Sequence, residues 1–144
     1  YSTTVLSVSQ NTLTALSFNT EAYDSRPSGL SAQWSSSYPT RLYCRVAGTY
    51  VCGMSISVYT GYVTATSRLA LRIRKNGTGV TFAGGGGVMS PSHFFDASTS
   101  GMIDLAAGDY IEFMVYTDQS GGTQIYAASS SDYTAQMAWM TRIA

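Results

Sequence analysis

The feature that most constrains this chain is an alternation of apolar and polar side chains with a period of two residues. The stretches 41–46, 50–58 and 68–74 each carry large apolar side chains at every second position. Because successive side chains of a β-strand point to opposite faces, this spacing predicts strands with one buried face. No segment combines helical spacing with capping residues. The chain is therefore expected to be all-β.

Turn residues separate the alternating stretches at short intervals. Asn76-Gly77 is the strongest hairpin signal, because both residues tolerate a positive φ angle. About eight to ten short strands at this spacing predict an antiparallel β-sandwich of jelly-roll type, and the length suits one domain over residues 1–144. The expected strands are 13–18, 41–46, 50–58, 68–74, 80–83, 101–105, 110–117, 124–127 and 133–143.

Composition excludes several functional classes. The chain has 8 Lys+Arg and 8 Asp+Glu, and only 11% of its residues are charged. Such a balance provides no general electrostatic footprint for nucleic acid. No apolar run approaches the ~18 residues of a membrane span, so no membrane insertion is expected. With 44% hydrophobic residues the chain should fold, and its surface should consist mainly of hydroxyl, amide and phenol groups.

The sequence offers little for catalysis, a metal or a cofactor, and none of the three is expected. His93 is the single histidine and is interpreted as a solvated loop residue. Gly84–Gly87 lacks the Lys-Ser/Thr of a phosphate loop and is interpreted as a flexible loop. Asp104 and Asp109 flank one turn without calcium-loop spacing, so turn chemistry is favoured over a calcium site. A glycosidase pair formed by two carboxylates that meet in space stays open.

Cys44 lies on the apolar face of stretch 41–46, and Cys52 lies on the apolar face of stretch 50–58. A three-residue connection could join these two stretches as a hairpin. On paired strands they would be neighbours facing the core. A disulfide between directly opposed strand residues has awkward geometry. Buried free thiols that act as small hydrophobes are therefore favoured, and the disulfide remains the alternative.

A row of arginines forms one candidate contact site. Arg68, Arg72 and Arg74 have the same parity and should share a strand face. They are interpreted either as a solvated outer row that discourages edge pairing, or as guanidinium groups that meet carboxylates of a neighbouring subunit or an acidic ligand. The sequence favours neither interpretation over the other.

Oligomerisation is favoured by apolar side chains on the second faces of the last strands. A sandwich strand of a monomer normally exposes one face to water. Here that face carries Tyr110, Met114 and Tyr116 in one strand and Met140 in the final one. Rows of Tyr and Met are typical of subunit interfaces. These four residues are the predicted interface of an oligomer.

Seven short stretches, taken in order, carry a resemblance to a known family. They are TALSF at 14–18, EAYD at 21–24, RL at 41–42 before VAGTY at 46–50, RIRKNG at 72–77, LAAGDYI at 105–111 and MTRI at 140–143. Together they resemble a phage virion version of the jelly roll shared by the complement globular head and tumour necrosis factor. The resemblance implies a ten-stranded jelly roll that assembles as a tight trimer and has no catalytic residues.

The function that this resemblance implies is structural. We expect a non-enzymatic trimer at the virion surface that decorates and cements the capsid, with the major capsid protein or other virion proteins as partners. Three weak contacts of one trimer would combine into a durable attachment. The alternative is a tail-fibre tip or adhesion module in which Tyr- and Ser-rich loops such as 31–38 contact a host surface glycan. A hydrolase built on the same sandwich is disfavoured.

Overall fold

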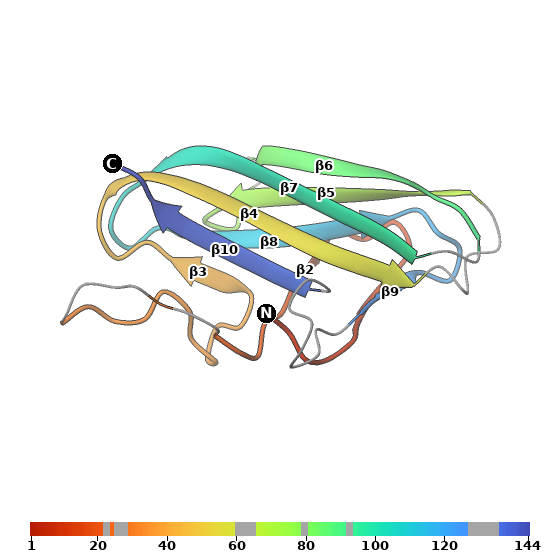
Figure 1. The fold of residues 1–144 in the computed structure, drawn as a ribbon, viewed down its shortest axis with the longest axis horizontal. Coiled ribbons are helices and arrows are strands. Elements are labelled where there is room, and N and C mark those ends of the chain that lie inside the picture. Colours follow the sequence, from red (N-terminus) through yellow and green to blue (C-terminus); the bar gives the residue numbers. More distant parts are fainter. Residues whose placement is uncertain (22–23, 25–28, 60–65, 79–80, 92–93, 127–135) are drawn as a thin grey trace.

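The computed structural model describes residues 1–21, 24, 29–59, 66–78, 81–91, 94–126 and 136–144, and every regular element in these ranges is a β-strand (Figure 1). The strands are β1 (Leu6–Val8), β2 (Thr14–Ala15), β3 (Arg41–Tyr43), β4 (Gly48–Tyr59), β5 (Ser67–Lys75), β6 (Thr81–Met89), β7 (Phe94–Leu105), β8 (Tyr110–Thr117), β9 (Thr123–Ile125) and β10 (Gln136–Arg142).

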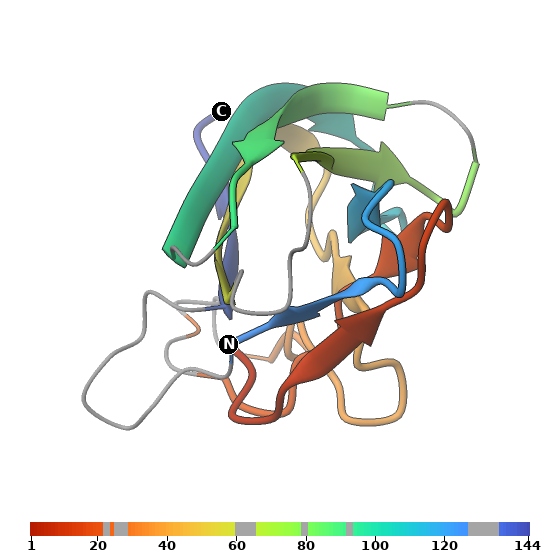
Figure 2. The same cartoon turned by 90° about the vertical axis from the view of Figure 1, so that its right-hand side faces the viewer.

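The strands form two antiparallel sheets that face each other (Figure 2). In sheet A, β7 pairs with one edge of β4, while β10 and β9 share the other edge and β1 extends the sheet beyond β9. In sheet B, β5 pairs with β8 and β6, while β2 and β3 share the other edge of β8. The predicted all-β, antiparallel sandwich is confirmed.

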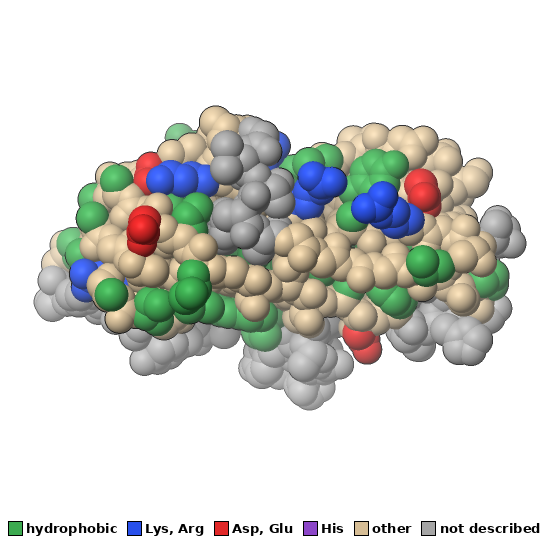
Figure 3. All heavy atoms as spheres, turned by 90° about the horizontal axis from the view of Figure 1, so that it is seen from above, with side chains coloured by type: hydrophobic (Ala, Val, Ile, Leu, Met, Phe, Trp, Pro, Cys, Tyr) green, Lys and Arg blue, Asp and Glu red, His purple; other side chains and the backbone are tan. Residues whose placement is uncertain are grey.

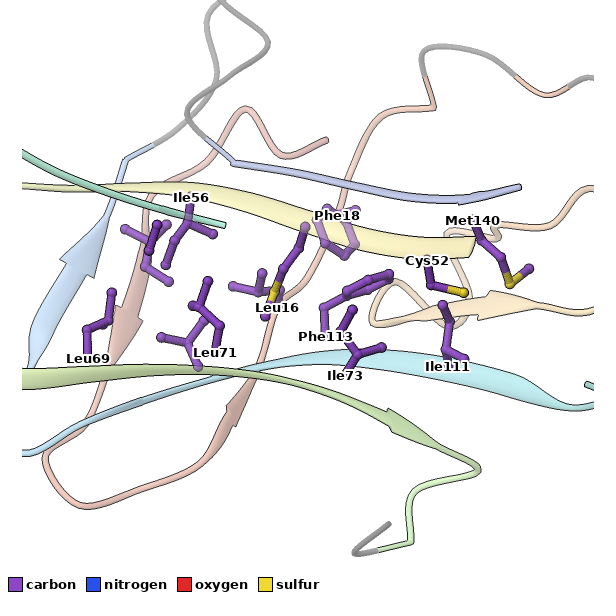
Figure 4. Packing of buried hydrophobic residues seen from close by; sticks show 14 of the residues in the cluster. Leu16, Phe18, Cys52, Ile56, Leu69, Leu71, Ile73, Ile111, Phe113 and Met140 are labelled. Atoms are coloured by element: carbon purple, nitrogen blue, oxygen red, sulfur yellow. The ribbon is translucent and has the colours of Figure 1, made fainter. Parts of the chain in front are cut away.

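The core lies between the sheets and follows the predicted alternation (Figure 4). On β4, the buried side chains are those at every second position from Tyr50 to Val58. Leu69, Leu71 and Ile73 of β5 lie opposite them with their side chains buried, and Phe113 of β8 meets another core ring edge-to-face at 6.1 Å between centroids. Burial of each large apolar side chain contributes roughly 1.5–3 kcal/mol to folding.

The predicted hairpin between 41–46 and 50–58 is wrong. β3 pairs with β8 in sheet B, whereas β4 belongs to sheet A, so the chain crosses the sandwich between them. Two hydrogen bonds hold Cys44 beside the turn before β8: its N–H donates to the Asp109 carbonyl at 2.7 Å, and its carbonyl accepts from Gly108 N–H at 2.9 Å. Alternation cannot distinguish strands paired in one sheet from strands facing each other, because both arrangements bury the same side chains.

The predicted flexible loop at Gly84–Gly87 is also wrong, because these residues lie within β6. A Cβ atom at Gly85 would lie 2.9 Å from the carbonyl oxygen of Ser98, and one at Gly87 would lie 2.7 Å from the Phe95 ring. Both of these contacts come from β7. The missing side chains therefore let the edge of sheet B approach sheet A, and β6 and β7 run side by side (Figures 1 and 2).

Several strand bounds differ from those predicted. β8 has its predicted range, whereas β7 begins at Phe94 rather than at 101. β2 is only two residues long, although the neighbouring Leu16 and Phe18 are buried. β1 was not predicted, because three residues are too few to display a period. Of the predicted strand 133–143, residues 133–135 lie outside the described part of the chain.

Cys44 and Cys52 are free, and both side chains are fully buried in the core. They reach the core from different parts of the sandwich rather than from paired strands. The Cys44 thiol donates a hydrogen bond to the Val46 carbonyl at 3.1 Å. Burial raises the pKa of Cys52 to about 12, and the neighbouring Cys44 adds to this rise. The thiolate is therefore strongly disfavoured while the protein is folded.

A thiol-reactivity prediction follows from this burial. Neither cysteine of the folded protein should react with Ellman's reagent at pH 8, because the thiolate is the nucleophile and both sulfur atoms are inaccessible. Both should react at once in 6 M guanidinium chloride. Stopped-flow absorbance at 412 nm measures the two rates, and rapid modification of the folded protein would contradict the buried position.

Candidate interaction surfaces

The outer face of sheet B gathers the largest share of the cationic side chains. Five of the chain's eight Lys and Arg residues lie on sheet B strands, and Glu112 is the single acidic residue on those strands. The pairings Arg74↔Glu112 and Arg41↔Glu112 place outward side chains of β5, β8 and β3 in one transverse row. We call the following set the arginine face: Arg41, Arg68, Arg72, Arg74 and Glu112. The structure thus puts the three predicted arginines on one face.

Glu112 lies between two of these arginines and is almost fully buried, with 5% of its surface exposed. Its Oε2 accepts from Nε of Arg74 at 3.0 Å, and its Oε1 accepts from Nε of Arg41 at 3.4 Å. Each carboxylate oxygen therefore has its own guanidinium partner, which offsets the cost of burying the charge. The two ion pairs tie β3 and β5 to opposite edges of β8.

Tyrosine rings surround the Arg41 end of this face. The Arg41 guanidinium lies 4.3 Å from the centroid of the Tyr110 ring and 5.3 Å from that of Tyr38. Tyr43 packs against Tyr110 at 5.7 Å, and Arg45 lies 4.8 Å from the centroid of the Tyr43 ring. Such cation–π contacts contribute about 0.5–1 kcal/mol each at exposed sites. They hold the Arg41 guanidinium in a fixed position.

Arg68 and Arg72 differ from the two arginines that contact Glu112. Among the described residues, no carboxylate lies within ion-pair distance of either guanidinium. Asp118 lies nearby, but its Oδ1 accepts from the backbone N–H of Arg68 at 2.5 Å. Both side chains are exposed. Two cations of the face are thus available to a ligand.

The structure divides the predicted oligomer interface. Tyr110, Met114 and Tyr116 lie on the outer face of sheet B, but Met140 points into the core from sheet A and is 6% exposed. Pairing of Met140 with Cys52 of β4 fixes this inward orientation. Because both faces of β10 are half apolar, its alternation could not assign the inner side. The prediction that all four residues form one row is wrong for Met140.

Met114 and Tyr116 have neighbours within their own chain. Met114 is 2% exposed, although it points away from the core. The Tyr116 hydroxyl donates to the Asn11 side-chain oxygen at 3.0 Å. Met114 is therefore buried, and the Tyr116 hydroxyl is hydrogen-bonded, within one chain and without a second subunit.

A partly exposed apolar strip lies instead on the outer face of sheet A, and no sequence pattern singled it out. Met102 of β7 is 68% exposed and pairs with Val51 of β4. Trp139 of β10 covers Gly53, where an added Cβ would overlap the indole ring. We call the set Val51, Met102, Met137 and Trp139 the sheet A strip. It is the outward counterpart of the core-facing row of β4.

A polar pocket of about 390 Å³ lies where β5 begins and β8 ends. Its lining is made of amides, hydroxyls and one carboxylate: Gln10, Asn11, Thr66, Ser67, Asp118, Gln119 and Ser120. Ser67 donates a hydrogen bond to the side-chain oxygen of Gln119 at its floor. Neutral polar groups in this arrangement suit a ligand rich in hydroxyl groups. No periodic pattern in the sequence marks the pocket, because its residues come from three separate segments of the chain.

The candidate calcium residues serve the turns. Asp109 accepts hydrogen bonds from Lys75 at 2.7 Å, from the Asn76 side chain at 2.8 Å and from Ala106 N–H at 2.8 Å. The bond from Lys75, followed by that from Asn76, lowers the pKa of Asp109 to about 2. Asp104 accepts from the Thr49 hydroxyl at 2.6 Å. The two carboxylates thus have separate partners, and this arrangement joins the Asn76-Gly77 turn to the turn before β8.

Other candidate chemistry is limited in the described ranges. No group of three or more His, Cys, Asp or Glu side chains there could hold a metal ion. His93 lies outside the described residues. No helix in the described ranges has the length and apolar character to cross a membrane. Seen from the side of β6 and β7, the surface is mostly uncharged, with a few charged side chains set among it (Figure 3).

Comparison with known proteins defines the fold. No family model and no curated protein matches this sequence. Murine APRIL matches in structure with a TM-score of 0.51 and 18% identity, over 85% of this chain and 89% of that one. The globular domain of zebrafish complement 1qA gives 0.50 and 18%, over 85% and 95% of the two chains. Eiger TNF from S. frugiperda gives 0.52 and 10%, over 100% and 94%.

The protein therefore has the jelly-roll fold of tumour necrosis factor and the complement globular head. This result confirms the predicted fold class. At these identities the likeness concerns the fold alone, so function rests on the surfaces described above.

Proposed function

We propose that the protein is a non-enzymatic, homotrimeric structural protein of a phage virion. It would lie at the virion surface and cement the capsid through contacts with the major capsid protein or other virion proteins. The observation that carries this proposal is the contrast between the two outer faces of the jelly roll. One face offers an apolar strip that includes the exposed Met102, and the other offers a row of arginines. A trimer with one face buried at its axis keeps the other free for a partner.

The sheet A strip is the better surface for self-association. In a three-fold assembly, equivalent patches of the three copies converge on the axis. Convergence of three arginine faces would bring like charges together, which costs free energy. The sheet A strip instead consists of uncharged side chains, among them Met102 and Trp139. The two carboxylates of this face, Asp96 and Asp104, lie outside the strip, where they accept hydrogen bonds from Ser57 and Thr49. We therefore place the trimer axis beside sheet A.

Substitution of Met102 tests this placement. M102E should convert the trimer to monomers, because three carboxylates would be buried near one axis without cations to pair with them. Met102 is 68% exposed in the single chain, so the new side chain should leave the fold intact. Size-exclusion chromatography with multi-angle light scattering gives the mass, and circular dichroism checks the fold.

Val88 provides the matched control, because it is 61% exposed on the outer face of sheet B. V88E should remain trimeric. A trimeric M102E together with a monomeric V88E would instead support an interface that includes Tyr110, Met114 and Tyr116. Charge substitution of Met114 itself is a poor test, because its burial in the monomer would destabilise the fold.

The cementing role is tested on shells. Phage heads stripped of this protein should recover it on incubation, in a fixed ratio to the capsid subunit, and should then resist heat or low salt better. Sedimentation of heads followed by gel quantification measures the ratio. Presence of a few copies per particle at the tail, with no retention on heads, would reject this role.

A glycan-binding adhesion module at a tail-fibre tip is the second candidate. The polar pocket favours it, since amides and hydroxyls dominate its lining, and so does Tyr38 in the predicted loop 31–38, which is exposed. A glycan array with wild-type protein and the pocket variant Q10A distinguishes the two candidates. Binding to neutral glycans that Q10A loses would support the adhesion role.

A further inference from the structure

The arginine face creates a local charge that the whole chain does not have. Net charge over the sequence is zero, yet on the outer face of sheet B four guanidinium groups accompany one carboxylate. A patch of one sign attracts ligands of the other sign even when the protein is neutral.

Unused hydrogen-bond donors lie along the outer face of β5 at Arg68, Arg72 and Arg74, separated by four and two residues. Arg74 contacts Glu112 through Nε, and in the described part of the chain its two Nη groups have no partner. Arg68 and Arg72 have no ion pair there either. Side chains two residues apart on a strand are about 7 Å apart. The free guanidinium groups therefore form a straight row spanning roughly 20 Å.

Beside the middle of this row the surface is low, because Gly84 and Gly86 of β6, which have no side chains, pair with Arg72 and Ala70. The exposed Val88 pairs with Arg68 at one end of the row, so no apolar anchor lies at its centre. Ala70 itself is small and buried, and Met114 on the other side of the row is also buried. Protein interfaces rely on apolar or aromatic anchors at their centre. The arginine face instead suits a narrow ligand that is recognised by its charge and by bidentate hydrogen bonds from arginine.

We infer that the arginine face binds an acidic polysaccharide, a chain that carries carboxylate or sulfate groups on successive sugar units. Each acidic group accepts hydrogen bonds from one guanidinium of the row Arg68, Arg72 and Arg74. Individually weak contacts combine because the groups belong to one polymer. The inference goes beyond the capsid role and does not depend on it, since the row lies within one chain.

Binding to immobilised polysaccharides tests the inference. The probes are heparin as the sulfated chain, polygalacturonate as the carboxylated chain and dextran as the neutral one. Wild-type protein should bind heparin or polygalacturonate at 50 mM salt, lose most of this binding at 500 mM, and ignore dextran. R72Q should weaken binding about three- to tenfold, and R68Q/R72Q further.

Arg142 provides a control of equal charge, because it is exposed on β10 in the opposite sheet. R142Q should change the affinity less than about twofold. An equal loss in R142Q and R72Q would overturn the inference, as would the absence of binding to both acidic chains. Tighter binding to poly-glutamate than to either polysaccharide would also overturn it and would indicate an acidic protein partner. Melting temperatures confirm that the variants fold.

The same samples separate this inference from the proposed function. M102E should still bind the acidic polysaccharide, more weakly through loss of avidity, even where it no longer forms trimers. R68Q/R72Q should remain trimeric. Failure of the shell-binding experiment with intact polysaccharide binding would reject the capsid role alone.

Discussion

Replacement of Gly86 with alanine is expected to lower the free energy of unfolding by about 3 kcal/mol or more. Gly86 has a φ angle of 134°, which side-chain-bearing residues rarely adopt. An added Cβ would lie 2.1 Å from the Leu69 carbonyl oxygen and 2.8 Å from the Ala70 Cα. Both atoms belong to the backbone of β5, so relief of the overlap requires a shift of the β5–β6 ladder.

Gly84 is the matched control for this substitution. It lies two residues earlier on the same strand, and an added Cβ would meet only the Leu71 carbonyl oxygen at 3.7 Å, an ordinary contact. G84A should therefore be neutral or stabilise the protein by about 0.4–1 kcal/mol, because it restricts the unfolded chain. Urea unfolding followed by fluorescence measures both variants. Equal stability of G84A and G86A would contradict the constraint on Gly86.

Local sequence patterns predicted the parts of the fold that depend on one strand or one turn. The burial of Met54, Ile56 and Leu71 follows from alternation alone. The Asn76-Gly77 hairpin follows from residue conformation, and both residues have positive φ angles of 52° and 66°. Neither property requires knowledge of the rest of the chain.

Partner choice between strands could not be predicted in this way. β3 and β4 are adjacent in sequence but belong to opposite sheets, because β3 pairs with the distant β8. The close approach of β7 to Gly85 and Gly87 could not be predicted for the same reason. Their missing side chains matter only because β7 lies against them, and a glycine run without that neighbour is typical of a loop.

The candidate surfaces were partly visible in the sequence. Parity alone placed Arg68, Arg72 and Arg74 together, since a strand repeats every two residues. Met102 was missed because its flanking residues alternate weakly. Glu112 carried a signal that could have been used: it is the single acidic residue in a strand of apolar and aromatic residues. A lone carboxylate in such a strand requires a cation from a neighbouring strand.

The second large effect concerns this carboxylate. E112Q is expected to lower the free energy of unfolding by about 2 kcal/mol, which corresponds to a fall of about 4–8 °C in melting temperature for a domain of this size. Glutamine keeps the shape of the side chain but leaves the Arg41 and Arg74 guanidinium groups facing a neutral amide. Loss of a fully buried pair costs about 3–5 kcal/mol. Both arginines are about a third exposed, so solvent reduces this cost.

Asp96 provides the control, because its carboxylate is exposed on β7. D96N should change stability by less than about 0.5 kcal/mol. Salt separates the two cases further: 1 M NaCl screens exposed charges, but the deficit of E112Q should persist because Glu112 is buried. If 1 M NaCl abolished the difference in free energy of unfolding between E112Q and the wild type, the Glu112 contacts would be ordinary surface ion pairs. A difference that persists in salt means that β8 requires both arginines for stability. Part of the arginine face then stabilises the fold, and only Arg68, Arg72 and the free end of Arg74 are available to a ligand.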